Sequence, residues 1–345
     1  MASTSNTQDP LLRVEDLRVE FHTDDGLVTA VRGVDWQLRA GETLGVVGES
    51  GSGKSVTSLA LMGLIPQPPG KIVSGRAIYR GKDLLKMSSK ELSNIRGNRI
   101  AMIFQDPMTA LNPFLTVEDQ LTEVTRRHLG LSAKEATKHA IEMLEKVGIP
   151  SASKRVFEYP HQFSGGMRQR VMIAMALSCK PDILIADEPT TALDVTIQAQ
   201  ILELMKELQE QEGTAILMIT HDLGVIANIA HRVQVMYAGR VVEKATVDEL
   251  FQNPRHPYTL GLLESAPRVD QLEAELRPIP GQPPDLSKLP GGCSFRPRCP
   301  FSIANCSEVD PPLFDSPSGG GYACLVNIDE APRHDAASQI SEDQS

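Results

Sequence analysis

Short apolar runs alternate with helical patterns along the chain between Leu11 and about Phe251. Five of the runs are typical of strands, and in chain order they read TLGVVG, RIAMIFQ, DILIADE, AILMITHD and RVQVMYAGR. Because these runs are apolar throughout, rather than at every second position, they indicate strands that are buried on both faces. Strands of this kind are joined by crossover helices, so the pattern predicts an α/β fold with a parallel sheet.

Two parts of the chain depart from this alternation. The stretch from Thr116 to Val147 has helical spacing without a strand, which predicts a helical subdomain at about residues 108–165. Further along, ten of the 24 prolines fall between Pro278 and Pro317, so little regular structure is expected there. The expected organisation is a disordered tail at 1–10, a main domain at 11–255, a C-terminal region at 256–330 and a second disordered tail at 331–345.

Composition and charge narrow the class of protein. The 345 residues are 41% hydrophobic and 23% charged, which is typical of a folded globular chain with room for two domains. The apolar runs fall short of the roughly 18 residues that a membrane span needs, and the N-terminus lacks the pattern of a secretory signal, so we expect a cytoplasmic protein. A formal net charge of −10 argues against nucleic acid as the main ligand.

A glycine-rich motif follows the first apolar run. Residues 48–55 read GESGSGKS, which fits G-x-x-x-x-G-K-[ST], and the helical pattern SVTSLALMGLI overlaps its end. In such a loop the glycines let backbone N–H groups turn toward phosphate oxygens, and the next helix adds the positive end of its dipole. The motif predicts that Lys54 bridges the β- and γ-phosphates of a nucleotide and that Ser55 binds Mg²⁺.

The third apolar run ends in two carboxylates, Asp187 and Glu188. Acids at the end of a buried strand are not needed for packing, although a solvated strand end can also carry them. In a chain that also has a phosphate loop, the pair predicts a catalytic role for these two acids. Asp187 is expected to hold Mg²⁺, and Glu188 is expected to polarise the attacking water as a general base.

The segment from Phe163 to Gln169, FSGGMRQ, resembles the Ser-Gly-Gly-x-x-Gln signature of the ATP-binding cassette (ABC) ATPases. A serine and two glycine amides at the start of a helix form a second phosphate site. The resemblance implies a P-loop NTPase fold of the ABC type with a helical subdomain. It also implies that two subunits stack head to tail, so that each signature caps the nucleotide held by the partner's phosphate loop.

Other positions match the ABC pattern in order and spacing. Gln105 matches the family glutamine that touches Mg²⁺ and the water, Asp194 in Ala192-Leu193-Asp194 matches the interface loop, and His221 matches the switch histidine that contacts the γ-phosphate. Phe21 is the candidate for stacking on adenine, with His22 or simple core packing of Phe21 as alternatives.

The resemblance therefore implies three sets of site residues. The catalytic set is Glu188, His221 and Gln105, and the Mg²⁺ ligands are Ser55, Gln105 and Asp187. The residues expected to bind the nucleotide are Phe21, Gly48, Glu49, Ser50, Gly51, Ser52, Gly53, Lys54, Ser55, Val56, Ser164, Gly165, Gly166, Gln169, Asp187 and Asp194.

The resemblance extends over almost the whole chain. The segments that look like the ATPase subunits of dipeptide and oligopeptide importers are FQDPMTALNP (104–113), RHPYT (255–259), IPGQPP (279–284) and GGCSFRPRCP (291–300). This implies an ATPase that powers peptide import from the cytoplasmic face of the inner membrane. The implied partners are two permease subunits, a second similar ATPase subunit and an extracytoplasmic solute-binding protein. The alternatives are an importer of nickel or another solute from the same family, an exporter of the same fold, and a soluble ABC protein acting on ribosomes or DNA.

The proline-rich region is not expected to build a core of its own, and it contains a cysteine quartet: Cys293, Cys299, Cys306 and Cys324. In a reducing compartment this crowding favours a metal over disulfides. Some peptide importer ATPases hold a [4Fe–4S] cluster at this kind of spacing, so the resemblance implies one here, with Arg296 and Arg298 offsetting its charge. Zinc, for which the short knuckle spacing is missing, and four unligated thiols are the alternatives.

Overall fold

The structure is a computed structural model of the chain, and it describes residues 9–24, 26–106, 110–190, 194–266, 277–316 and 319–334. Contacts divide the chain into two compact units. The first, the helical unit, consists mainly of Gln37–Thr43 and Tyr79–Ile219. The second, the phosphate-loop unit, consists of Arg13–Trp36, Leu44–Ile78 and the chain from Thr220 onward. The C-terminal region thus shares a compact unit with the glycine-rich loop instead of forming a unit of its own.

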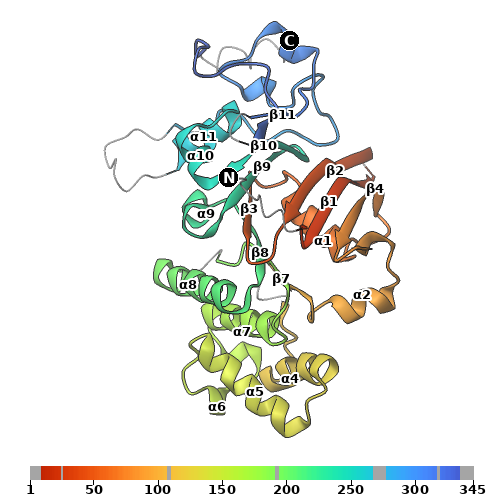
Figure 1. The fold of residues 1–345 in the computed structure, drawn as a ribbon, viewed down its shortest axis with the longest axis vertical. Coiled ribbons are helices and arrows are strands. Elements are labelled where there is room, and N and C mark those ends of the chain that lie inside the picture. Colours follow the sequence, from red (N-terminus) through yellow and green to blue (C-terminus); the bar gives the residue numbers. More distant parts are fainter. Residues whose placement is uncertain are drawn as a thin grey trace, which may run out of the picture. The chain divides into compact units, whose positions relative to one another are not determined.

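Parallel strands form the sheet of the helical unit (Figure 1). They are β6 (Ile100–Ile103), β7 (Ile183–Asp187) and β8 (Ala215–Thr220), and β7 pairs with both of the others. Every residue of these strands is buried, which confirms the strands that the continuous apolar runs predict. Because the carboxyl ends of parallel strands meet at one edge of a sheet, the residues that follow β6 and β7 are brought close together.

Helices make up most of the rest of the helical unit. Before β6 lie β5 (Lys82–Asp83), the 3₁₀ turn η1 (Leu84–Lys86) and α2 (Ser89–Ile95). After β6 come α4 (Val117–Leu129), α5 (Ala133–Lys146), α6 (Ala152–Arg155), η2 (Pro160–Gln162), α7 (Gly165–Leu177) and, beyond β7, α8 (Val195–Glu212). Across the described ranges, no helix is both long enough and apolar enough to cross a bilayer.

The helices α4, α5 and α6 fall within the range predicted for the helical subdomain, and they lie together in Figure 1. Capping boxes start the two longer helices: Thr116 pairs with Asp119 at the start of α4, and Ser132 pairs with Glu135 at the start of α5. Each box satisfies backbone N–H groups that a helix start leaves without partners. The local sequence therefore sets where these helices begin.

One sheet of the phosphate-loop unit contains the other two predicted strands. β3 (Thr43–Val47) pairs in parallel with β9 (Arg232–Tyr237), and β9 pairs antiparallel with β10 (Arg240–Thr246). Two short strands extend this sheet, since β12 (Gly321–Tyr322) pairs with β10, and β11 (Phe314–Asp315) pairs with β12. The helices α1 (Lys54–Leu61), α9 (Leu223–Ile229) and α10 (Val247–Gln252) belong to the same unit.

A second sheet of this unit was not predicted. Its neighbouring strands are β2 (Gly26–Leu38), β1 (Leu12–Thr23) and β4 (Gly70–Tyr79). Buried and exposed positions alternate along much of β1, so that Val14, Leu17 and Val19 are buried between exposed or half-buried neighbours. A search for continuous apolar runs misses strands that bury one face, because their apolar residues are interleaved with polar ones.

The C-terminal region has more structure than its proline content suggests. It contains α11 (Pro257–Ser265) and two 3₁₀ turns, η3 (Arg296–Arg298) and η4 (Ala304–Ser307). The buried carboxylate of Glu243, on β10, accepts hydrogen bonds from the backbone N–H groups of Arg255 at 2.7 Å and His256 at 2.9 Å. These bonds join the start of α11 to the sheet.

An aromatic cluster joins this region to the core of the sheet. Phe295 packs on Tyr258 and on Tyr237 of β9, with ring centroids 5.4 and 5.2 Å apart, and the two tyrosine rings are 4.6 Å apart. All three side chains are buried. The proline-rich segments therefore complete a core on a strand of the sheet rather than building one by themselves.

Candidate nucleotide-binding site

The glycine-rich loop connects the end of β3 to the start of α1. Gly48 has φ +153°, and a Cβ atom there would lie 2.2 Å from the carbonyl oxygen of Met236. Gly53 has φ +97°, and a Cβ atom there would lie 2.5 Å from the carbonyl oxygen of Ala30. Both positions need glycine because the loop packs its backbone directly against neighbouring backbone and takes a left-handed conformation.

The buried side chain of Lys54 turns back over the loop that precedes it. Its Nζ donates to the carbonyl oxygens of Gly48 at 2.7 Å and Glu49 at 2.9 Å. Ser55 and Val56 follow in the first turn of α1, beside the positive end of the helix dipole. The ammonium group and the helix start are thus held in one place, as a phosphate site requires.

Glu49 connects the glycine-rich loop to the C-terminal region. Its backbone N–H donates to the hydroxyl of Tyr258 at 2.7 Å, and its carboxylate is bound by Arg298 at 2.6 and 2.9 Å. These contacts anchor the loop to the C-terminal region, and the nucleotide contact expected for Glu49 stays a prediction.

The two acids sit at the end of β7, as predicted. Asp187 is the last residue of the strand and is buried. Glu188 follows with φ +48°, a conformation that is uncommon for a residue with a side chain, and its N–H donates to the carbonyl oxygen of Ile219 at 2.8 Å. Strained backbone of this kind is concentrated at functional sites, where it sets the direction of a side chain.

Gln105 and Glu188 contact each other at the edge of the parallel sheet. The side-chain amide of Gln105 donates to Oε2 of Glu188 at 3.1 Å. Gln105 lies just beyond β6 and Glu188 just beyond β7, so the pairing of these two strands places the side chains together. The sequence motifs predict both residues, but the hydrogen bond between them is seen only in the folded structure.

The signature segment begins a helix, as predicted. Ser164 is the N-cap of α7, and its Oγ accepts a hydrogen bond from the N–H of Met167 at 3.3 Å. Gln169 is only 1% exposed, and its amide donates to the carbonyl oxygen of Pro189. This bond lets Gln169 hold the chain next to Glu188, and the nucleotide contact expected for Gln169 stays a prediction.

The remaining predicted residues occupy defined positions. Asp194 is the N-cap of α8 and accepts from the N–H of Ile197 at 3.0 Å, while Ala192 and Leu193 lie outside the described residues. His221 is exposed and immediately precedes Asp222, the N-cap of α9. Phe21 is half-buried on β1, and its role toward adenine stays a prediction.

These residues belong to both compact units. Phe21, His221 and the loop from Gly48 to Val56 are in the phosphate-loop unit. The helical unit holds the others: Gln105, Ser164, Gly165, Gly166, Gln169, Asp187, Glu188 and Asp194. Within each unit, side chains that are far apart in the sequence are brought together by the sheet.

The cysteine quartet lines a single pocket of the phosphate-loop unit, together with His256. All four cysteines are free thiols. Burial raises the pKa of Cys299, and the neighbouring Cys324 and Cys293 raise it further. Among the described residues, no set of three or more histidine, cysteine or acidic side chains is grouped as a metal ion needs. The fold therefore gathers the thiols in one pocket without forming a preset site for a single ion.

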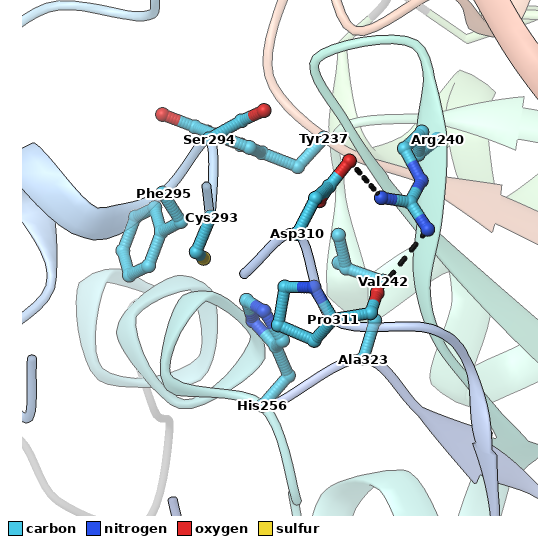
Figure 2. Close-up of a pocket in the computed structure, with 10 residues that line it drawn as sticks. All are labelled: Tyr237, Arg240, Val242, His256, Cys293, Ser294, Phe295, Asp310, Pro311 and Ala323. Atoms are coloured by element: carbon cyan, nitrogen blue, oxygen red, sulfur yellow. Dashed lines mark hydrogen bonds and ion pairs between the residues drawn. The ribbon is translucent and has the colours of Figure 1, made fainter. Parts of the chain in front are cut away.

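A neighbouring pocket is shown in Figure 2, where Cys293 and His256 lie opposite Arg240 and Asp310. The guanidinium of Arg240 pairs with Asp310 and donates to the carbonyl oxygen of Pro311 at 3.2 Å. Burial lowers the pKa of His256 to about 3, and its Nδ1 accepts from the N–H of Tyr258 at 3.1 Å. His256 is therefore neutral and fixed by its neighbours.

Comparisons with known proteins agree with these features. The chain matches the ABC transporter family over residues 31–191, and the oligopeptide/dipeptide transporter C-terminal region over residues 242–306. It is 58% identical over 305 residues to the oligopeptide transport ATP-binding protein OppD of Bacillus subtilis, covering 88% of this chain and 85% of that protein. It is 54% identical over 320 residues to OppD of Salmonella typhimurium, covering 93% of this chain and 95% of that protein.

Solved structures show the same fold. The chain is similar to a dimeric ATP-binding cassette in a post-hydrolysis state bound to ADP and phosphate, with a TM-score of 0.63 and 27% identity. That similarity covers 68% of this chain and 98% of the solved chain. A cassette described as CbiO1 of Clostridium perfringens, part of the CbiONQ transporter complex, matches with a TM-score of 0.59 and 29% identity over 71% of this chain and 92% of that chain.

Proposed function

The chain belongs to the family of ABC transporter ATP-binding proteins of the oligopeptide/dipeptide type, and we propose that it hydrolyses ATP to power the import of dipeptides or oligopeptides. The observation that carries this function is the hydrogen bond between Gln105 and Glu188, in a chain that also holds a built phosphate loop. The match of the C-terminal region to the peptide transporter family favours peptides over other solutes.

Each group at the site has a chemical role in this proposal. The loop amides and Lys54 bind the β- and γ-phosphates, and His221 contacts the γ-phosphate. Glu188 takes a proton from the attacking water, while Gln105 orients that carboxylate through its amide. The hydrogen bond from the backbone N–H of Glu188 to the carbonyl oxygen of Ile219 keeps the carboxylate in one orientation during the reaction.

The donor atoms available for a metal suit Mg²⁺. Ser55 offers a hydroxyl, Gln105 an amide oxygen and Asp187 a carboxylate, and hard oxygen donors are what Mg²⁺ prefers. When bound, the ion neutralises charge on the phosphate oxygens as it develops. Asp187 is buried at the end of β7, so its carboxylate is held in place for this role.

The second phosphate site, at Ser164, supports a dimer. The start of α7 presents a hydroxyl, two glycine amides and the positive end of a helix dipole. We propose that two ATPase subunits, either two copies or this chain with a similar partner, stack so that each signature caps the other's nucleotide. The similar solved cassette is described as a dimer with ADP and phosphate, which supports this arrangement.

An apolar patch on the helical unit supports docking to permeases. Phe114 is 86% exposed and Phe157 is 54% exposed, and Tyr159 is exposed beside them. The N–H of Val117 donates to the carbonyl oxygen of Glu158 at 3.0 Å, which holds the two segments side by side. Exposed aromatic side chains gathered in this way are typical of a protein interface. We propose that two permease subunits bind here, with a solute-binding protein outside, and that this chain lies on the cytoplasmic face of the membrane.

For the cysteine pocket, we propose a [4Fe–4S] cluster, with zinc as the alternative. Four thiols that line one pocket, two of them buried and two half-buried, are a suitable donor set for either, and a cluster is larger than a single ion. Arg298 is not available to offset cluster charge as expected, because its guanidinium binds Glu49. Anaerobic purification tests the proposal: a brown protein with broad visible absorption supports iron, and a colourless protein with stoichiometric zinc overturns it.

Transport itself tests the proposed function. The chain is reconstituted in proteoliposomes with its permeases and solute-binding protein, and uptake of peptides of graded length is measured with and without ATP. We expect ATP-dependent peptide uptake that Glu188→Gln abolishes. Nickel uptake without peptide uptake would favour the nickel importer. Recovery with ribosomes, but with no permease, from detergent-solubilised membranes would contradict a transport function.

A further inference from the structure

A paired ion contact joins the phosphate loop to the far end of the chain. Nη1 of Arg298 donates to Oε2 of Glu49 at 2.6 Å, and Nη2 donates to Oε1 at 2.9 Å. The Arg298 side chain is only 5% exposed, and the Glu49 side chain is 25% exposed. A bidentate pair of this geometry fixes both the position and the orientation of the carboxylate.

The guanidinium of Arg298 is itself held on several sides. Its Nε donates to the carbonyl oxygen of Pro280 at 2.8 Å. Its Cζ lies 5.9 Å from the ring centroid of Tyr237 and 6.0 Å from that of Phe295. Arg298 is therefore part of the aromatic core of the C-terminal region. Because Arg298 is fixed by that core, it holds the Glu49 carboxylate in a fixed position.

Glu49 passes this restraint to the lysine of the loop. Its carbonyl oxygen accepts from Nζ of Lys54 at 2.9 Å, and its N–H donates to the hydroxyl of Tyr258 at 2.7 Å. The side chain, the N–H and the carbonyl oxygen of this one residue are thus all engaged. A loop residue held at three points cannot turn without breaking contacts to the C-terminal region.

The contact between Arg298 and Glu49 also changes the charge of the phosphate loop. A carboxylate in a loop that binds a triphosphate repels the ligand, and that repulsion is strong where water is partly excluded. The Arg298 guanidinium neutralises the Glu49 carboxylate through both of its oxygens. Removing Arg298 would leave this negative charge uncompensated beside the nucleotide.

We propose that Arg298 is a positioning residue for ATP binding, which acts through Glu49 to hold the phosphate loop in its binding conformation and to cancel the charge of that carboxylate. The inference rests on the proposed ATP site and extends it to a residue of the C-terminal region. It also gives this region a task at the nucleotide: it completes the support of the phosphate loop.

The experiment compares ATP affinity and turnover among purified full-length variants. We expect Arg298→Gln to weaken Mg-ATP binding, measured by calorimetry, by about tenfold, as expected for the loss of a charge-assisted contact. The KM for ATP rises in parallel, while kcat falls less than twofold, because the hydrolytic residues are untouched. Arg298→Lys, which keeps the charge but not the fork, restores part of the affinity.

A matched control comes from another Arg–Glu pair of the same region. Arg333 binds Glu264 through its Nη1 and Nη2 atoms, and neither residue belongs to the loop. Arg333→Gln should bind ATP as the wild type does. If Arg298→Gln does not fold, the test passes to Arg298→Lys, for which we expect ATP binding about threefold weaker than in the wild type.

The outcomes separate this inference from the proposed function. Wild-type ATP affinity in a folded Arg298 variant, or equal losses in the Arg298 and Arg333 variants, overturns the positioning role while leaving the ATPase intact. If the wild-type chain does not bind Mg-ATP, or if the Lys54→Ala variant binds it equally well, the proposed ATP site itself is overturned. A double variant of Arg298→Gln and Glu49→Gln should bind ATP more tightly than Arg298→Gln alone, since the uncompensated carboxylate is gone, and weaker binding contradicts the charge argument.

Discussion

The amide of Gln105 donates to the carboxylate of Glu188 at 3.1 Å, across the ends of two neighbouring parallel strands. Gln105 precedes the helical subdomain in the chain, and that subdomain carries the exposed patch at Phe114 and Phe157. This hydrogen bond joins the residue that leads into the subdomain to the proposed catalytic base, within one compact unit.

Glu188→Gln should leave ATP binding intact and lower ATP hydrolysis at least roughly 100-fold, because the amide cannot accept the proton of the attacking water. Glutamine has the same shape, so the backbone at φ +48° is preserved. Phosphate release and equilibrium nucleotide binding are measured, with size-exclusion chromatography to detect an ATP-bound dimer. Glu207→Gln, at an exposed position of α8, is the control. Unchanged turnover would remove Glu188 from the mechanism.

Gln105→Ala should reduce hydrolysis by about tenfold, since the base loses the hydrogen bond that orients it. Gln105→Glu should reduce hydrolysis further than Gln105→Ala does. Two carboxylates this close favour a shared proton, and a protonated Glu188 cannot act as a base, so this variant should need a higher pH than the wild type for activity. The pH–rate profiles of the two variants are compared. Identical profiles would show that the contact has no part in catalysis.

Ser164→Asp separates the two roles of the signature serine. Aspartate is as good an N-cap as serine, so α7 should keep its stability, whereas Ser164→Ala should cost about 1 kcal/mol in unfolding free energy. The added charge, however, repels a phosphate at the helix start. We expect a stable Ser164→Asp protein with little ATPase activity and no ATP-induced dimer. Wild-type activity in this variant would mean that α7 does not cap a nucleotide.

Replacing Phe114 and Phe157 by serine should abolish binding to the permeases and leave the basal ATPase rate of the isolated chain within about twofold of wild type. The reason is that the apolar patch is exposed and distant in the chain from the phosphate loop. Co-purification from membranes measures the first effect and phosphate release the second. Val73→Ser, at an exposed apolar position on β4, is the control. Retained permease binding would place the docking surface elsewhere.

Much of the site can be predicted from short segments of the sequence. The phosphate loop, the acids after β7 and the signature before α7 can be predicted because each depends on a local backbone conformation that a few neighbouring residues impose. Gly48 and Ser164 illustrate this, one through its positive φ and the other through its capping hydroxyl. The strands β3, β6, β7, β8 and β9 were predictable for a similar reason, since burial on both faces leaves a continuous apolar run.

Tertiary structure decided the contacts between residues far apart in the chain. The sequence placed Glu49 in a phosphate loop and Arg298 beside cysteines, but their bidentate contact exists only because α11 and the aromatic cluster hold the C-terminal region against β9. Gln169 likewise is a buried support for Pro189, a contact that its place in the signature does not predict. Local patterns specify backbone conformation, whereas which side chains meet depends on how distant elements pack, and no short segment carries that information.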